Sequence, residues 1–168
     1  MADKMRIGWI GTGVMGLSMA GHLQSAGYPL TVYNRTRAKA EPLLAKGAQW
    51  ADTPREVAAK SDAVFTIVGF PRDVESVILG ENGVLQGLAS GGLVCDMSTS
   101  SPVLAERIAV AALQQGCVSM DAPVTGGDIG ARNATLSIFV GGDKEGYEKL
   151  EPCFNTMGKN IVHCGGGG

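Results

Sequence analysis

Three glycines near the amino terminus have the spacing of a phosphate-binding turn. Gly11, Gly13 and Gly16 follow an apolar run of strand type and open a stretch with helical spacing. In such a turn the first glycine permits the sharp bend, the second lets the backbone approach a pyrophosphate, and the third lets the helix pack on the sheet. The N–H groups at the helix amino end then face the phosphates. A glycine-rich turn without a ligand is the alternative. We predict that the whole turn binds a dinucleotide through Gly11, Thr12, Gly13, Val14, Met15 and Gly16.

The residues after the next predicted strand indicate which dinucleotide is bound. An Asp or Glu about 20 residues beyond the glycines usually bonds the ribose 2′-hydroxyl of NAD. Here that position holds Asn34, followed by Arg35 and Thr36. A 2′-phosphate meets no like charge there, and a charge-assisted hydrogen bond from Arg35 is worth about 1.5–3 kcal/mol. We therefore expect NADP(H) to bind more tightly than NAD(H), by roughly ten- to a hundredfold. The alternative is a solvated surface arginine, and Arg37 could add to the site.

The apolar pattern of the chain predicts the elements that position these residues. Strands are predicted at 5–10, 30–33, 49–51, 63–68, 92–96, 118–121, 136–140 and 161–163, and helices at 14–25, 37–46, from 54 onward, and at 72–79, 101–115 and 144–156. We expect the helix at 101–115 to bury Val103, Leu104, Ile108, Ala111 and Ala112. Strands that alternate with helices imply parallel strands and right-handed crossovers. The predicted fold class is α/β, a doubly wound Rossmann-type domain with a mostly parallel sheet and helices on both faces. Its ligand should bind beyond the carboxyl ends of the strands.

Composition excludes several classes of function. The 168 residues fit one domain, and 45% of them are hydrophobic. A net charge of −2 provides no basic face for nucleic acid. No apolar run approaches the roughly 20 residues that a bilayer span needs, so no membrane association is expected. The four cysteines lie far apart, and no His, Cys or carboxylate cluster has metal-ligand spacing. We expect no metal site and a reducing, cytoplasmic location.

Three segments together resemble the β-hydroxyacid dehydrogenases. This family includes 3-hydroxyisobutyrate dehydrogenase, the tartronate-semialdehyde and glyoxylate reductases and, more distantly, 6-phosphogluconate dehydrogenase. Residues 7–16 are similar to its opening fingerprint, and residues 32–36 look like its NADP-using branch. The most specific segment is 121–127, followed by Ala131 and Thr135, which is similar to the substrate-binding signature of the family. Serine is more frequent there at the position of Thr125. The resemblance covers essentially the whole chain.

The resemblance implies further site residues. Thr125, Gly126 and Gly127 would hold a small carboxylate substrate through a hydroxyl and backbone N–H groups, which suits a glycine-rich turn. A tight turn without this role is the alternative. Two more groups would contact the cofactor after the fourth and fifth strands, namely Val68, Gly69 and Pro71, and Ser98 and Thr99.

The resemblance also implies a domain layout. Members of the family continue through a glycine-rich stretch into a helix that carries a catalytic lysine, and then into a helical domain that forms the dimer. We expect residues 1–164 to be an NADP-binding domain and residues 165–168 to begin a hinge to that absent domain. Lys144, Lys149 and Lys159 do not match the catalytic position, so no catalytic residue is assigned here. The chain should bind cofactor but reduce or oxidise substrate poorly, and the full-length protein should be a homo-oligomer through the missing domain.

The leading functional hypothesis is therefore one half of an oxidoreductase that transfers a hydride between nicotinamide and a small β-hydroxy acid or semialdehyde acid. One alternative is a stand-alone regulatory module that binds NADP without catalysis. Another is a fragment of a 6-phosphogluconate dehydrogenase-like enzyme, which predicts basic residues for a sugar phosphate. Only Arg132 lies near Thr125 in the sequence.

Overall fold

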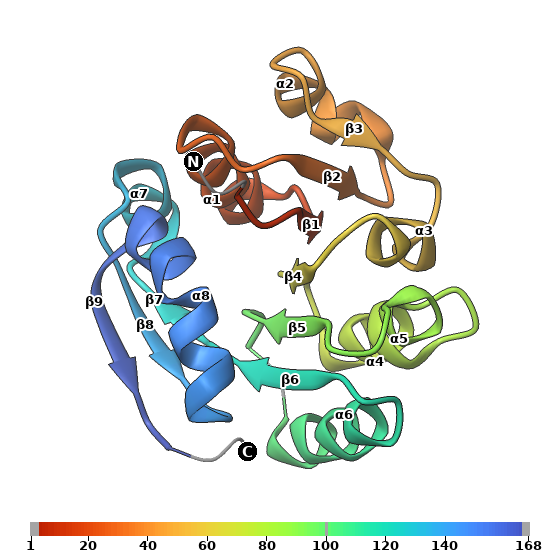
Figure 1. Ribbon diagram of the computed structural model, residues 1–168. Helices are drawn as coiled ribbons and strands as arrows, with labels where there is room; N and C mark the ends of the chain where they lie inside the picture. The colour runs from red at the N-terminus through yellow and green to blue at the C-terminus, as the bar shows by residue number, and fades with distance from the viewer. Residues whose placement is uncertain (1–3, 100, 166–168) are drawn as a thin grey trace.

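A six-stranded parallel sheet forms the centre of the molecule (Figure 1). The computed structural model describes residues 4–99 and 101–165. The strand order is β3-β2-β1-β4-β5-β6. Successive strands are added toward one edge of the sheet from β1 to β3 and toward the other edge from β4 to β6, so the order reverses between β1 and β4. The strands are β1 (Ile7–Ile10), β2 (Leu30–Tyr33), β3 (Gln49–Trp50), β4 (Ala63–Thr66), β5 (Leu93–Asp96) and β6 (Val118–Asp121). This arrangement confirms the predicted doubly wound α/β fold.

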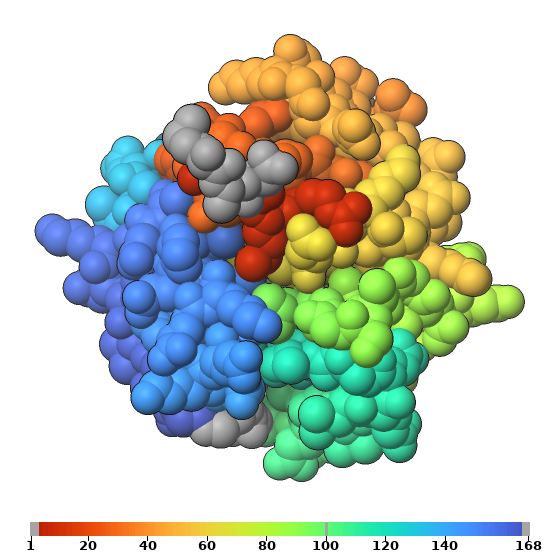
Figure 2. Space-filling model, viewed as in Figure 1, coloured from red at the N-terminus to blue at the C-terminus, as the bar shows by residue number. Residues whose placement is uncertain are grey.

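Helices cover both faces of this sheet because its side chains alternate between two apolar clusters. Trp9 and Phe65 point into one cluster, together with α1 and α8, whereas Ile10 and Val64 point into the other, with α3, α4 and α6. The helices are α1 (Val14–Ser25), the 3-10 helix η1 (Arg37–Ala40), α2 (Glu41–Leu44), α3 (Pro54–Ala59), α4 (Pro71–Leu79), α5 (Val84–Gly87), α6 (Pro102–Gln114), α7 (Gly127–Asn133) and α8 (Lys144–Met157). In the part of the chain that is described, none of them is long and apolar enough to cross a membrane. Figure 2 shows α8, in blue, packed directly against the segment around β6.

A second, smaller sheet was not expected from the sequence. It consists of β7 (Val124–Thr125), β8 (Leu136–Val140) and β9 (Gly158–His163). β7 and β8 are antiparallel, whereas β8 and β9 are parallel. Pro123 separates β7 from β6, and a proline has no N–H with which to continue a ladder. The last residue of β6, Asp121, already forms an antiparallel bridge with Gly141 beyond β8, and the chain continues past Pro123 into the second sheet.

Two other predictions were wrong. The helix predicted at 37–46 is divided into η1 and α2, because Pro42 has no N–H to donate to the preceding turn. Val103 is 68% exposed, and α6 instead buries Leu104, Ile108 and Ala112, which are spaced four residues apart. The short helices α5 and α7 were not predicted, since four and seven residues are too few to show a helical period.

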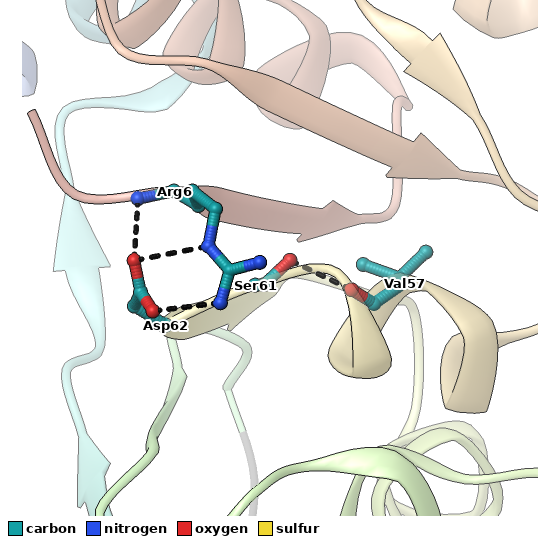
Figure 3. A network of polar contacts seen from close by, with 4 residues as sticks. All are labelled: Arg6, Val57, Ser61 and Asp62. Carbon is teal, nitrogen blue, oxygen red and sulfur yellow. Dashed lines mark hydrogen bonds and ion pairs between the residues drawn. The ribbon is translucent and has the colours of Figure 1, made fainter.

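Polar contacts join the amino ends of β1 and β4, at the edge opposite the predicted site (Figure 3). The Arg6 guanidinium donates to both carboxylate oxygens of Asp62, at 3.0 and 3.3 Å, and the Arg6 backbone N–H donates to the same group at 2.9 Å. Next to them the Ser61 hydroxyl donates to the Val57 carbonyl at 2.7 Å. These contacts fix the entry of β4 beside β1. Residues 1–3 and 166–168 of the expected domain and hinge lie outside the described residues.

Candidate functional site

A cleft of about 1010 Å³ lies at the carboxyl edge of the main sheet, where the strand order reverses. Its walls are the turn between β1 and α1, the chain after β2, and the turn between β4 and α4. Most of the predicted cofactor residues line it, namely Gly11, Gly13, Val14, Met15, Gly16, Asn34, Arg35, Thr36, Val68 and Gly69. Thr12, Pro71, Ser98 and Thr99 are not among its lining residues.

The three glycines of the turn have different surroundings. Gly11 has a φ of +104°, and a Cβ there would overlap the Ile67 carbonyl oxygen. A Cβ on Gly16 would overlap the Gly11 carbonyl oxygen, so this glycine brings α1 against the turn. Gly13 has no atom within 4 Å of the position of a Cβ. The backbone at Gly13 therefore faces open space inside the cleft, which fits the close approach of a pyrophosphate.

Asn34 connects the glycine turn to the end of β2. Its side-chain oxygen accepts a hydrogen bond from the Thr12 backbone N–H at 2.9 Å, and its side-chain nitrogen donates to the Thr36 carbonyl at 2.9 Å. The Thr12 hydroxyl is buried and has no hydrogen-bond partner within the described residues. Asn34 therefore positions the turn. In the sequence, Asn34 is recognisable only as the position where a carboxylate is absent.

Arg35 reaches across the cleft to the opposite wall. Its guanidinium lies 3.2 Å from a carboxylate oxygen of Asp73, in the first turn of α4. The other oxygen of Asp73 accepts the backbone N–H of Phe70, the N-cap residue of α4, at 3.1 Å. Arg37 instead lies over the ring of Trp50, 5.2 Å from its centroid. Arg35 is thus the arginine that lines the cleft, and Asp73 is a lining residue that the sequence analysis missed.

Ser98 supports the cleft wall from behind. Its hydroxyl accepts the Val68 backbone N–H at 2.8 Å, and its own N–H donates to Asp96 at 3.1 Å. The same Asp96 oxygen accepts the Thr66 hydroxyl at 2.8 Å. Burial raises the pKa of Asp96, and these hydrogen bonds oppose that rise. The network ties the turn after β4 to the end of β5.

Ser98 and Thr99 line a second cavity instead of the main cleft. This cavity has a volume of about 290 Å³ and lies between β5, β6 and α6, where Asp96 and Asp121 also contribute to its wall. The expected contact of Ser98 and Thr99 with the nicotinamide end of a cofactor therefore stays a prediction.

The predicted substrate turn lies at the edge of the second sheet. Thr125 ends β7, Gly126 is the N-cap of α7 and Gly127 begins that helix, and all three are exposed. Gly126 and Gly127 have φ values of +131° and +63°, which explains why glycine occupies both positions. None of the three lines either cavity. Arg132, in the following helix, is 3.8 Å from Asp128.

All four cysteines lie within the described ranges and are free thiols, and Cys95 and Cys117 are buried. Among residues 4–99 and 101–165, no group of three or more His, Cys, Asp or Glu side chains could hold a metal ion.

The chain matches a family model and several known proteins in sequence, and solved structures in fold. Residues 6–166 match a family model described as the NAD binding domain of 6-phosphogluconate dehydrogenase. The chain is 56% identical to the probable 3-hydroxyisobutyrate dehydrogenase-like 1 of Arabidopsis thaliana, a mitochondrial protein by its name, over 94% of this chain and 47% of that protein. It is 43% identical to 2-hydroxy-3-oxopropionate reductase of Escherichia coli, over 98% of this chain and 56% of the reductase.

A solved structure of Psf3 in complex with NADP+ and 2-OPP superimposes with a TM-score of 0.88 at 31% identity, covering 93% of this chain and 55% of that one. The chain thus spans about half the length of the curated relatives that it matches.

Proposed function

Because the chain belongs to the family described as the NAD-binding domain of 6-phosphogluconate dehydrogenase, we propose that its cleft binds NADP(H) more tightly than NAD(H). The supporting observation is that Arg35 is exposed at the cleft wall where a Rossmann domain receives the adenosine ribose, while no carboxylate follows β2. The membership itself agrees with the resemblance to the hydroxyacid dehydrogenases inferred from the sequence.

Different residues of the chain bind different parts of the cofactor in this proposal. Gly13 leaves space for the pyrophosphate, and the amino end of α1 directs its N–H groups toward it. Arg35 donates to the 2′-phosphate. The Asn34 side chain accepts the Thr12 N–H and so holds the glycine turn beside the end of β2. Ser98 fixes the Val68 backbone, which forms the opposite wall. The bound cofactor would supply hydride transfer at its nicotinamide ring.

We further propose that the whole protein transfers a hydride between this cofactor and a small β-hydroxy acid or semialdehyde acid. Two relatives are named as a 3-hydroxyisobutyrate dehydrogenase-like protein and a 2-hydroxy-3-oxopropionate reductase, and both names refer to small acids. Thr125, Gly126 and Gly127 would bind the substrate carboxylate, and the proton donor would be a lysine outside this chain. A sugar-phosphate substrate is less favoured, because Arg132 has Asp128 beside it.

The location and assembly of the protein belong to the same proposal. Four free cysteines favour a reducing compartment such as the cytoplasm, although the plant relative is mitochondrial by name. We expect the full-length protein to form a homo-oligomer through the part of the relatives that this chain does not span.

A paired titration with NADPH and NADH tests the cofactor assignment. Trp9 is a suitable probe because its indole N–H donates to the Gly11 carbonyl at 2.8 Å, beside the glycine turn. We expect NADPH to bind at least about tenfold more tightly, and Arg35→Ala to abolish that preference. Arg37→Ala is the matched control, because its guanidinium lies over Trp50, and it should leave the preference unchanged when measured by calorimetry. Binding of neither cofactor would overturn the proposal.

A further inference from the structure

The Arg35–Asp73 ion pair joins the two walls of the cleft that would enclose the adenosine ribose. Arg35 follows β2, and Asp73 lies 38 residues later in the first turn of α4. Both side chains line the cleft. A carboxylate therefore faces the arginine that we assign to the 2′-phosphate, although no carboxylate stands at the end of β2.

The two partners of this pair are held very differently. The Arg35 side chain is 85% exposed, whereas that of Asp73 is only 19% exposed. One oxygen of Asp73 is fixed by the Phe70 backbone N–H at the amino end of α4, which leaves the other oxygen for Arg35. If Arg35 turns toward another anion, the carboxylate stays in place in the cleft wall. The pair can therefore open by motion of the arginine alone.

We propose that Asp73 reduces the preference of the cleft for NADP(H) over NAD(H), an inference that rests on the proposed binding of a dinucleotide in this cleft. Toward NADP(H), the carboxylate competes with the 2′-phosphate for Arg35 and repels its charge. Toward NAD(H), it provides the acceptor for the ribose 2′-hydroxyl that Rossmann domains usually place after the second strand. Asp73 thus weakens the binding of NADP(H) and strengthens the binding of NAD(H).

The variant Asp73→Asn separates this role from that of a helix cap. The asparagine oxygen can still accept the Phe70 N–H, because an amide side chain at N3 can fill this capping role as a carboxylate does. Its uncharged amide no longer holds Arg35 or repels a phosphate. We expect the Kd for NADPH to fall about two- to fivefold and the Kd for NADH to rise by a similar factor, which is the range of one exposed ion pair or neutral hydrogen bond.

Glu75→Gln is the matched control. Glu75 lies on the same helix and forms an exposed ion pair with Arg107 at 3.2 Å, but it does not line the cleft. This variant should change neither Kd. Far-UV circular dichroism and the thermal unfolding midpoint of each variant, measured without cofactor, establish that α4 is folded.

The decisive observation is the direction of the two changes. A lower Kd for NADPH together with a higher Kd for NADH supports the selectivity role, since a damaged helix would weaken the binding of both cofactors; the reverse pair of changes contradicts it. Parallel weakening, or an unchanged ratio in a chain whose wild type binds NADPH, overturns the role of Asp73 and leaves the proposed function intact. A wild-type chain that binds neither cofactor overturns both.

Discussion

At the scale of single residues, the three glycines of the turn show how one residue type serves different purposes. Gly11 and Gly16 are needed by the protein itself, because a Cβ on either would overlap a backbone carbonyl oxygen. Gly13 lies in extended backbone, with a φ of −72°, and a side chain there would enter the empty cleft. The contacts confirm the predicted sharp turn at Gly11 and the close packing of α1 at Gly16, whereas the approach of a phosphate to Gly13 stays a prediction.

This difference predicts opposite effects of two alanine substitutions. Gly16→Ala should lower the free energy of unfolding by about 1–3 kcal/mol, because overpacking forces the backbone apart. Gly13→Ala should leave stability nearly unchanged and weaken NADPH binding by about tenfold or more, because the methyl group occupies the path of the pyrophosphate. Urea unfolding and calorimetric titration of both variants check this. Undiminished binding by a folded Gly13→Ala variant would contradict the placement of the phosphates.

At the scale of elements, the cleft depends on how the turn after β4 is held. The turn has no regular structure between Thr66 and α4, yet its Val68 N–H is fixed by Ser98, two residues beyond the end of β5. Asp96 in turn fixes that serine and the Thr66 hydroxyl. Two strand ends are thus coupled through polar side chains behind the cleft wall.

Removing the Ser98 hydroxyl should loosen this wall. Ser98→Ala leaves the Val68 N–H without its acceptor, and a partly buried unsatisfied amide costs about 1–3 kcal/mol of stability. Cofactor binding should weaken as well, because Val68 lines the cleft. Ser101→Ala is the comparison, since its hydroxyl caps α6 by accepting the Leu104 N–H at 3.0 Å. It should cost about 1 kcal/mol and leave the Kd for NADPH unchanged, as measured by denaturant unfolding and titration. Equal binding by both variants would show that the wall does not depend on Ser98.

At the scale of the whole molecule, the carboxyl and amino ends of the strands in the main sheet carry different features. The carboxyl edge carries the cleft, whereas the amino edge carries the Arg6–Asp62 contacts (Figure 3). Hydrogen bonds from Arg6 lower the pKa of Asp62 below its ordinary value of 3.8, against the opposing effect of desolvation. A depressed carboxyl pKa contributes stability above the unfolded value, and this contribution is lost as the pH falls through the folded value.

The amino edge should therefore show a pH-dependent stability effect. Asp62→Asn should lower the free energy of unfolding at pH 7 by about 0.2–1 kcal/mol, a small value because both side chains are about half exposed. The difference from the wild type should shrink as the pH falls below 3.8, where the folded Asp62 becomes protonated. Urea titrations across this pH range measure it, and Arg6→Met provides the background in which Asp62→Asn should have little effect. NADPH affinity should not change, because the pair lies at the opposite edge.

Much of the fold was predictable from local sequence alone. The bounds of β2, α1, β6 and β8 agree with the predictions, and the glycine turn follows β1 as its spacing required. Each of these features depends on residues that are near neighbours in the chain, where the alternation of apolar residues and the conformational freedom of glycine act directly. The same local reasoning identified Arg35 as a cofactor-binding candidate.

Tertiary structure decided the features that depend on distant residues. The second sheet, the exposure of Val103 and the bond between Ser98 and Val68 all depend on which segments pack together. The partner of Arg35 is the clearest example, since Asp73 reads in the sequence as an ordinary acidic residue in the first turn of a helix. A sequence pattern specifies the local period and turn of the chain, whereas a contact across the cleft exists only after folding has brought its two walls together.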